Sequence, residues 1–444
     1  MKWQLLLLIV LASSVTGAHA STTTTSYRVA LQGGYVVVGT TVAYYNGSFS
    51  TILKVYSLNG SLLEVRVLPG ADLLQLAASE STLFGVALAK GNLEAFVASL
   101  PGLSMEIYFL PYSSASFLPS GAGVQVLYLG TCSTRTLVSL VGRFLITFAS
   151  TCNDGEHRLN VSVRDLLSGA VSNALTVPFN DSLLVGNASL VVLNGEGAFI
   201  YSLLPSPKEV ISLSNATFVG GGPPIVFVRG NNTLLFDGEG NEVGSLRGRY
   251  QYLAGYTENG SYTVALVPLG EQPTFLARPS TIVLLTSDGS RSVSVIEAPL
   301  PSQAVFVDGR LFGLYASSSG WIVRSLEYNV SSVLNLTGPV ELGELDGYLM
   351  VSEVRSPEYL SASLPGTASV LYSVPNLTEV AYVPYPLLPV AVTGDKVLLA
   401  GNRLLLSPLP YFHRGGGPPL FPLVVVPSVV FMLVLLYYLY RRRR

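Results

Sequence analysis

The sequence predicts an all-β protein built from one repeated four-stranded unit, followed by a single apolar helix at its C-terminus. Three observations predict this. Short β-branched and aromatic runs alternate with Gly, Asn, Asp, Ser and Pro from residue 21 to 408, no stretch there keeps a helical period, and residues 420–440 carry no charge. Charged residues make up 12% and hydrophobic residues 49% of the chain, which excludes a disordered protein.

The charge distribution excludes one class of function. Residues 21–408 carry a net charge of -8, while the last four residues are all arginine. Binding to nucleic acid needs clustered Lys and Arg to neutralise phosphates, so an acidic body argues against nucleic acid as a partner.

Residues 1–20 have the features of a secretory signal peptide. Lys2 supplies a positive charge, an apolar run extends from Leu5 to Ala12, and Ala18-His19-Ala20 forms a cleavage site. The alternative, an N-terminal membrane anchor, would need a longer run to span a bilayer. We therefore expect a mature chain that begins at Ser21, with a Ser/Thr-rich segment over 21–26.

The C-terminal region predicts a membrane anchor. A Gly/Pro stalk over 410–419 precedes 21 uncharged residues, 420–440, which as a helix would span roughly 30 Å. The arginine cluster 441–444 should stay cytoplasmic, which places the body outside the cell membrane in a single-pass topology, with lipid contacting the helix. Alternatives are a sorting signal cut by a transpeptidase, for which the short motif is absent, a GPI signal, and a buried core helix.

Asn-x-Ser/Thr sequons support an exterior location. Eleven of the 18 asparagines begin one, which favours heavy N-glycosylation. Turn chemistry explains the three that precede glycine, but not the others. The candidate glycosylation sites are Asn46, Asn59, Asn160, Asn180, Asn187, Asn215, Asn231, Asn259, Asn329, Asn335 and Asn376.

The only two cysteines predict a disulfide. Cys132 and Cys152 lie symmetrically about Gly142, with strand-like runs on both sides, so a hairpin turning at Gly142 would bring them roughly opposite each other. Such a bridge would be worth roughly 3 kcal/mol in the chain-entropy model. Free thiols remain an alternative, and so does a metal site, for which the mature chain offers only two histidines as further ligands, His157 and His413.

One unit recurs between the two ends of the chain. It reads as a strand, a turn with glycine, a second strand, a polar turn, a third strand, and a fourth strand before Pro or Gly. Copies run from Gly33 to Pro69 and from Gly142 to Pro178, each with its last residue 36 positions after its first, and weaker copies start at Asp308, Asp346 and Gly394.

This unit resembles the repeats of β-propellers, without Trp-Asp pairs or kelch glycine doublets. The resemblance implies a single propeller over residues 27–409 with about seven to eight four-stranded blades; a string of β-sandwiches is the alternative. Residues 112–135 look like an insertion. The final copy, Pro389 to Leu409, is short of a fourth strand, and Tyr27 to Leu31 is the candidate to complete it.

Signatures of chemistry are sparse. The sequence contains no HExxH, GxSxG, Walker or GxGxxG motif, and we assign no catalytic residue, metal ligand or cofactor. His157 falls at an expected hairpin tip and His413 in the stalk. Asp237 to Glu242 has carboxylates spaced as in a calcium loop, but Glu242 stands where that loop needs glycine, so an Asp-Gly hairpin turn is favoured.

Two classes of function remain. The first is a non-enzymatic surface protein, a binding platform or a component of a cell envelope or membrane complex with protein partners. The second is a membrane-anchored hydrolase or lyase with acidic residues at the mouth of the propeller channel. The scarcity of histidine and of acidic residues favours the first. Low Lys, higher Arg and dense sequons would suit an archaeal envelope.

Overall fold

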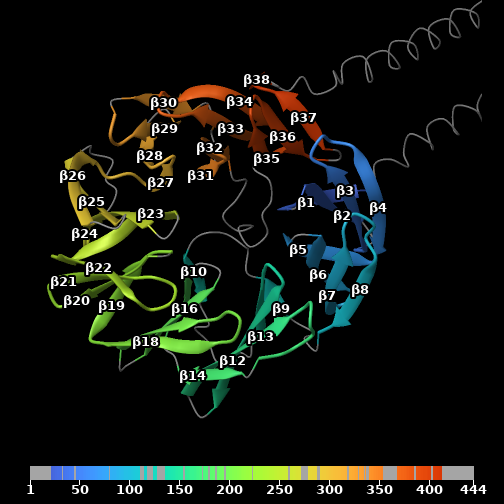
Figure 1. Cartoon of the computed structure of the whole chain (residues 1–444), viewed down its shortest axis with the longest axis horizontal. Helices are drawn as coiled ribbons and strands as arrows, with labels where there is room; N and C mark the ends of the chain where they lie inside the picture. The colour runs from blue at the N-terminus through green and yellow to red at the C-terminus, as the bar shows by residue number, and fades with distance from the viewer. Residues whose placement is uncertain are drawn as a thin grey trace, which may run out of the picture.

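A computed structural model shows nine β-sheets arranged around a central axis, which is the architecture of a β-propeller (Figure 1). It describes residues 22–412, apart from 33, 45–46, 80, 111–114, 118–123, 128–135, 154–155, 173, 179–180, 186–187, 195–196, 223, 259–260, 272–278, 288–290, 318–319, 329, 335, 337–339, 354–367, 385–386 and 402–403. The sheets are numbered here in chain order, as the first to the ninth.

The first two sheets show the basic pattern of a blade. Four consecutive strands pair antiparallel, and the strand that comes first in the chain lies nearest the axis (Figure 1). The first sheet contains β1 (Thr22–Gln32), β2 (Tyr35–Tyr44), β3 (Phe49–Ser57) and β4 (Leu62–Pro69), and the second contains β5 (Ala71–Ser79), β6 (Thr82–Ala89), β7 (Asn92–Ser99) and β8 (Met105–Phe109).

The third and fourth sheets each gain a fifth strand at the inner edge. The segment expected as an insertion supplies both: β9 (Ala115–Phe117) pairs parallel with β11, and β10 (Val124–Leu127) pairs antiparallel with β15. The other strands of these sheets are β11 (Thr136–Val141), β12 (Phe144–Asn153), β13 (Glu156–Asp165), β14 (Leu175–Pro178), β15 (Asp181–Val185), β16 (Ser189–Asn194), β17 (Gly197–Ser202) and β18 (Lys208–Ser214).

The fifth, sixth and seventh sheets return to four antiparallel strands. They contain β19 (Ala216–Gly220), β20 (Ile225–Arg229), β21 (Asn232–Phe236) and β22 (Glu242–Arg247); β23 (Tyr250–Glu258), β24 (Ser261–Pro268), β25 (Pro279–Ser287) and β26 (Arg291–Pro299); and β27 (Gln303–Val307), β28 (Arg310–Ser317), β29 (Gly320–Ser325) and β30 (Ser331–Leu334).

The last two sheets share the end of the described chain. The ninth sheet has only three strands, and the chain then returns to the eighth, where β38 pairs parallel with β34 at the outer edge. The eighth sheet contains β31 (Val340–Leu345), β32 (Tyr348–Glu353), β33 (Ala368–Ser373), β34 (Thr378–Pro384) and β38 (Tyr411–Phe412), and the ninth contains β35 (Leu388–Thr393), β36 (Lys396–Ala400) and β37 (Leu405–Pro408).

The turns between first and second strands follow the local sequence. Asp308-Gly309 and Asp346-Gly347 each place two successive residues at positive φ, 49° and 70° in one turn and 48° and 80° in the other. This is the geometry of a tight type I′ hairpin, which Asp-Gly adopts readily. Hairpins of this kind begin the repeats that the sequence marks at Asp308 and Asp346.

The core lies between neighbouring sheets rather than in one central cluster. Each blade buries both faces, so its middle strands are continuous apolar runs, as in Val36 to Val38 or Val226 to Val228. Buried polar groups also join adjacent blades: the side-chain amide of Gln75 in β5 donates to the carbonyl of Leu140 in β11 at 3.1 Å and accepts its N–H at 2.9 Å.

Two expectations from the sequence are wrong. The propeller has nine blades rather than seven or eight, because short units such as Ala216 to Arg247 need fewer residues than the repeat length suggested. The residues Tyr27 to Leu31 do form a strand, but they belong to β1, which pairs with β2 in the first sheet and does not complete the ninth. The shortness of the ninth blade itself is confirmed.

The predicted ends of the chain fall outside the described residues. These are the signal peptide 1–20, most of the stalk 410–419, the span 420–440 and the cluster 441–444. Within the part that the structure describes, no helix is long and apolar enough to cross a bilayer.

Candidate functional site

The ring closes between the ninth and first sheets through side chains. Val36, Val38 and Tyr56 of the first sheet form one buried cluster with residues of the ninth, Ala391, Leu398, Ala400 and Leu404. Among the described strands, none of the ninth sheet pairs with one of the first. We call this junction the closing seam, and it relies on apolar packing where a shared sheet would supply backbone hydrogen bonds.

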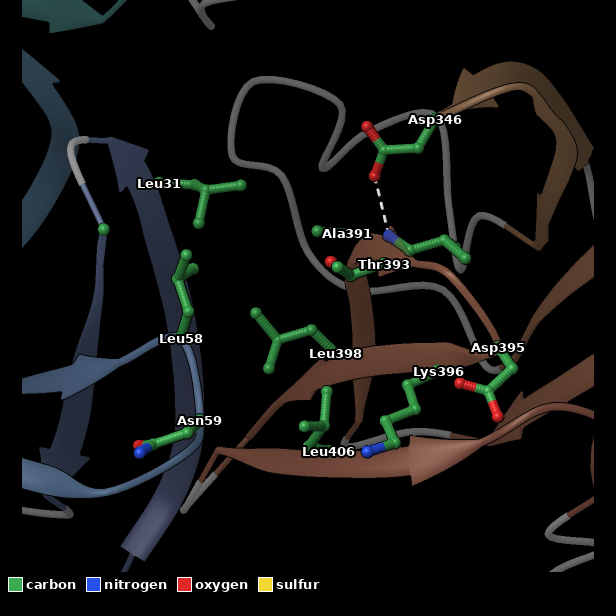
Figure 2. Close-up of a pocket in the computed structure, with 12 residues that line it drawn as sticks. Leu31, Leu58, Asn59, Asp346, Ala391, Thr393, Asp395, Lys396, Leu398 and Leu406 are labelled. Atoms are coloured by element: carbon green, nitrogen blue, oxygen red, sulfur yellow. Dashed lines mark hydrogen bonds between the residues drawn. The ribbon is translucent and has the colours of Figure 1, made fainter.

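A pocket of about 610 Å³ opens at one end of the closing seam (Figure 2). Leu31 and Leu58 of the first sheet form one wall, and Leu398 and Leu406 of the ninth form the opposite wall. Leu31, Leu58 and Leu406 are 42%, 50% and 38% exposed, which is unusual for leucine. This seam pocket therefore offers apolar surface that the fold itself leaves uncovered.

Polar groups stand around the leucines of the seam pocket. Asp346 reaches in from the eighth sheet, where its carboxylate accepts the N–H of Val392 at 2.6 Å and so ties the eighth blade to the ninth (Figure 2). Lys396 projects from β36 along the wall that holds Leu406, and its ammonium has no ion-pair partner in the described part of the chain. Thr393 and Asp395 complete this side.

Asn59 marks the first-sheet rim of the seam pocket. It lies in the turn between β3 and β4, where its amide oxygen accepts hydrogen bonds from the N–H of Ser61 at 3.1 Å and from the hydroxyl of Ser57. This local ring of hydrogen bonds holds the asparagine in place. In Figure 2 its amide group points away from Leu398 and Leu406, out of the pocket.

A second exposed apolar area lies on the outside of the first two blades. The outermost strands β4 and β8 carry six exposed apolar side chains, and Phe109 is 74% exposed. The guanidinium of Arg66 in β4 donates to the carbonyl of Leu103, just before β8, at 3.0 Å, so the two strands are neighbours. Val65 and Val67 lie on the face of β4 opposite to Arg66, because side chains alternate along a strand. We call this exposed area the outer apolar surface; its members are Leu62, Leu63, Val65, Val67, Ile107 and Phe109.

Five of the eleven predicted glycosylation sites lie among the described residues. Asn59, Asn215, Asn231 and Asn376 are exposed in turns. Asn160 is half-buried in β13, and its amide oxygen accepts the Thr176 hydroxyl at 2.6 Å. Glycosylation stays a prediction for all eleven, and the sites outside the described residues are Asn46, Asn180, Asn187, Asn259, Asn329 and Asn335.

The hairpin expected around Gly142 is confirmed, since β11 and β12 pair antiparallel with Val141 opposite Phe144. Cys152 lies near the end of β12, whereas Cys132 lies outside the described residues, four positions before β11 begins. The disulfide therefore stays a prediction.

The other candidate residues are parts of turns and strands. His157 lies at the start of β13, just after the hairpin tip, and His413 lies outside the described residues. The segment from Asp237 to Glu242 is the favoured hairpin turn, in which the Asp237 carboxylate accepts the N–H groups of Glu239 and Asn241 at 2.9 and 2.8 Å. Across the described residues, no cluster of three or more His, Cys, Asp or Glu could hold a metal ion.

The seam pocket could not be identified from the sequence. Its walls come from both ends of the propeller and from a turn of the eighth sheet, and only the pairing of strands shows which blades meet. The one available hint was the missing fourth strand of the final repeat, which indicated an unusual closure without showing where it lies.

No family model and no curated protein sequence matches the chain. Among solved structures, the chain is similar to the acylaminoacyl peptidase of Pyrococcus horikoshii, with 10% identity, a TM-score of 0.34 and coverage of 76% of this chain and 59% of that chain. It is also similar to the β-propeller domain of the trilobed protease from Pyrococcus furiosus (13%, 0.31, 68% and 98%) and to BamB from Moraxella catarrhalis (9%, 0.38, 87% and 96%). The chain thus spans about 59% of the peptidase. The β-propeller is shown by the chain's own strands.

Proposed function

We propose that this protein is a membrane-anchored, N-glycosylated propeller on the outside of the cell, which binds partner proteins of the envelope or membrane and does not catalyse a reaction. The outer apolar surface carries this proposal. Large exposed apolar areas mark interaction sites in soluble proteins, and six exposed apolar side chains lie on these two neighbouring strands. The surface also includes the outer edge of β4, and a free strand edge is a natural template for pairing with another chain.

The predicted anchor explains why such a surface would be useful. The described chain ends at Phe412, on the outer edge of the eighth sheet, and the rest of the stalk, 413–419, would add a tether of seven residues that reaches at most about 25 Å. The three glycines of that tether, Gly415 to Gly417, would let the body swivel. Partners should therefore lie within a few nanometres of the bilayer.

The proposal is tested by comparing two surfaces that carry the same kind of residue. The double variant Val67→Glu/Phe109→Glu places charges on the outer apolar surface. The matched control, Val293→Glu/Val295→Glu, changes two exposed valines of β26, which belong to the sixth sheet. Each full-length protein is expressed in its own host, cross-linked, purified in detergent and analysed by mass spectrometry.

We expect the first variant to lose cross-linked partners that the wild type and the control retain. Equal recovery from all three proteins would overturn the assignment to this surface, and a wild type without any reproducible partner would overturn the binding function. N-terminal sequencing should give Ser21 first, and recovery of the full-length chain without detergent would contradict the anchor.

A further inference from the structure

The seam pocket has the chemistry of a site for an amphiphile, and the groups that surround it indicate which kind. We infer that it binds an acyl chain with an anionic head group, the chain between the leucines of the two walls and the head group at Lys396. This function is additional to the binding of proteins by the outer apolar surface, and it uses different residues.

The size and lining of the seam pocket fit such a ligand. Its volume of about 610 Å³ falls inside the range of roughly 300–1,000 Å³ that small-molecule sites occupy. Leu31 and Leu58 face Leu398 and Leu406 across it (Figure 2). Burying a methylene group there would contribute about 0.8 kcal/mol, or about fourfold in affinity.

The charges around the pocket select the head group. The Asp346 carboxylate keeps its negative charge at the eighth-sheet end of the pocket, where it accepts the N–H of Val392 at 2.6 Å. In Figure 2 the Lys396 side chain runs toward Leu406, while the Asp395 carboxylate lies on the far side of that lysine, away from the leucines. Of the three charged groups that line the pocket, the ammonium of Lys396 is the one that Figure 2 shows beside Leu406, and it can make a charge-assisted hydrogen bond to a carboxylate or phosphate. The Thr393 hydroxyl lies on the same side and can donate a second one.

Asn59 does not fill the pocket even if it is glycosylated. Its amide oxygen is held by Ser61 and Ser57, and its amide group points out of the pocket. A sugar on that nitrogen would extend from the rim and leave the leucines accessible.

The test uses the full chain in phosphatidylcholine nanodiscs, because detergent would itself compete for an apolar pocket. Octanoate, decanoate and dodecanoate, each below its micelle concentration, are titrated by isothermal calorimetry, with dodecylammonium as the ligand of opposite charge. We expect affinity to rise by up to about fourfold for each added methylene until the pocket is filled. Dodecylammonium should bind at least tenfold more weakly than dodecanoate.

Two variants and one control assign the site. Lys396→Gln should weaken dodecanoate about tenfold, since it removes a charged hydrogen-bond partner. Leu406→Ser should flatten the dependence on chain length. Lys208→Gln, at an exposed lysine on the outer strand of the fourth sheet, should change neither. Circular dichroism checks that each variant is folded.

The source of the ligand is decided by a second arm with nanodiscs that contain phosphatidylglycerol. Binding of free dodecanoate identifies a soluble amphiphile as the ligand. Lysine-dependent cross-linking to phosphatidylglycerol alone identifies a lipid of the membrane. Both results support the site, because both depend on Lys396. The inference is overturned if dodecylammonium binds as well as dodecanoate, if affinity ignores chain length, or if Lys396→Gln and Leu406→Ser behave as the wild type in both arms.

Discussion

The joint between the second and third blades should depend strongly on one buried amide. Gln75 is 3% exposed, and its side chain receives the N–H and the carbonyl of Leu140, which is 2% exposed. Both groups of Leu140 lie on the inner edge of β11, where β9 pairs only as far as Val138. Gln75 therefore replaces a neighbouring strand for this residue.

Replacing Gln75 with methionine keeps nearly the same shape but leaves both groups of Leu140 without a partner. Each unsatisfied buried group costs roughly 1–3 kcal/mol, so we expect the free energy of unfolding to fall by about 2–5 kcal/mol. Gln303 provides the matched control. Its side chain makes the same kind of contact, donating to the carbonyl of Val340 at 3.1 Å and accepting the N–H of Leu342 at 3.0 Å, but Gln303 is exposed.

Water can replace the lost partner at Gln303, so Gln303→Met should cost no more than about 1.5 kcal/mol. Urea unfolding of the full-length proteins in identical micelles, followed by circular dichroism, measures both values. The reasoning is refuted if the two variants are destabilised equally, or if Gln75→Met costs less than about 1 kcal/mol.

Four further predictions concern other parts of the molecule. Gly85→Val should unfold the second blade or lower its stability by several kcal/mol, because a Cβ at Gly85 would lie 2.0 Å from the Phe96 ring; thermal melting measures this. A glycosylating enzyme added to the folded, unmodified protein should modify Asn59 but not Asn231. The Thr233 hydroxyl of the Asn231 sequon is fully buried and donates a hydrogen bond to the carbonyl of Gly248 at 2.9 Å. Modification of both asparagines would contradict this. Peptide mapping without reductant should recover Cys132 linked to Cys152, and two alkylated thiols would disprove the bridge. The free energy of unfolding should fall between pH 10 and 12 and be flat just below pH 10. Burial raises the pKa of four tyrosines to about 12, while their pKa in the unfolded chain stays near 10, so the unfolded state loses its protons first; the four are Tyr201, Tyr252, Tyr315 and Tyr372. Absorbance at 295 nm should show these tyrosines titrating only with unfolding.

Local features of the fold could be predicted from the sequence. The hairpin at Gly142, the Asp-Gly turns at Asp308 and Asp346, and the short final blade all follow from turn residues and β-branched runs, which act over a few positions. The blade count could not be predicted reliably, because some blades turn without a marked motif. The two residues between β5 and β6, Glu80-Ser81, do not include a glycine.

Contacts between segments that lie far apart in the chain could not be predicted from the sequence. Nothing local in Tyr27 to Leu31 distinguishes a strand that begins the first sheet from one that completes the ninth; the register with β2 decides it. The same limit applies to Gln75 and Leu140, which are 65 positions apart, and to the walls of the seam pocket. The sequons and cysteines could be identified in the sequence, but the sequence does not show which side chains surround them in the fold.

Closure of the ring by side-chain packing affects the order in which the blades can fold. Six of the nine sheets consist of one uninterrupted stretch of chain, and no described sheet waits for a strand from the opposite terminus. Residues in contact within each blade lie close together in the sequence, and domains fold from the N-terminal end onward while the chain is being synthesised. The first blade can therefore form while the last is still being synthesised, and each later blade can dock onto the one before it. A protein exported as an unfolded chain could assemble blade by blade in this way. Among the described residues, the joints that must wait for the end of the chain are the closing seam and the pairing of β38 with β34.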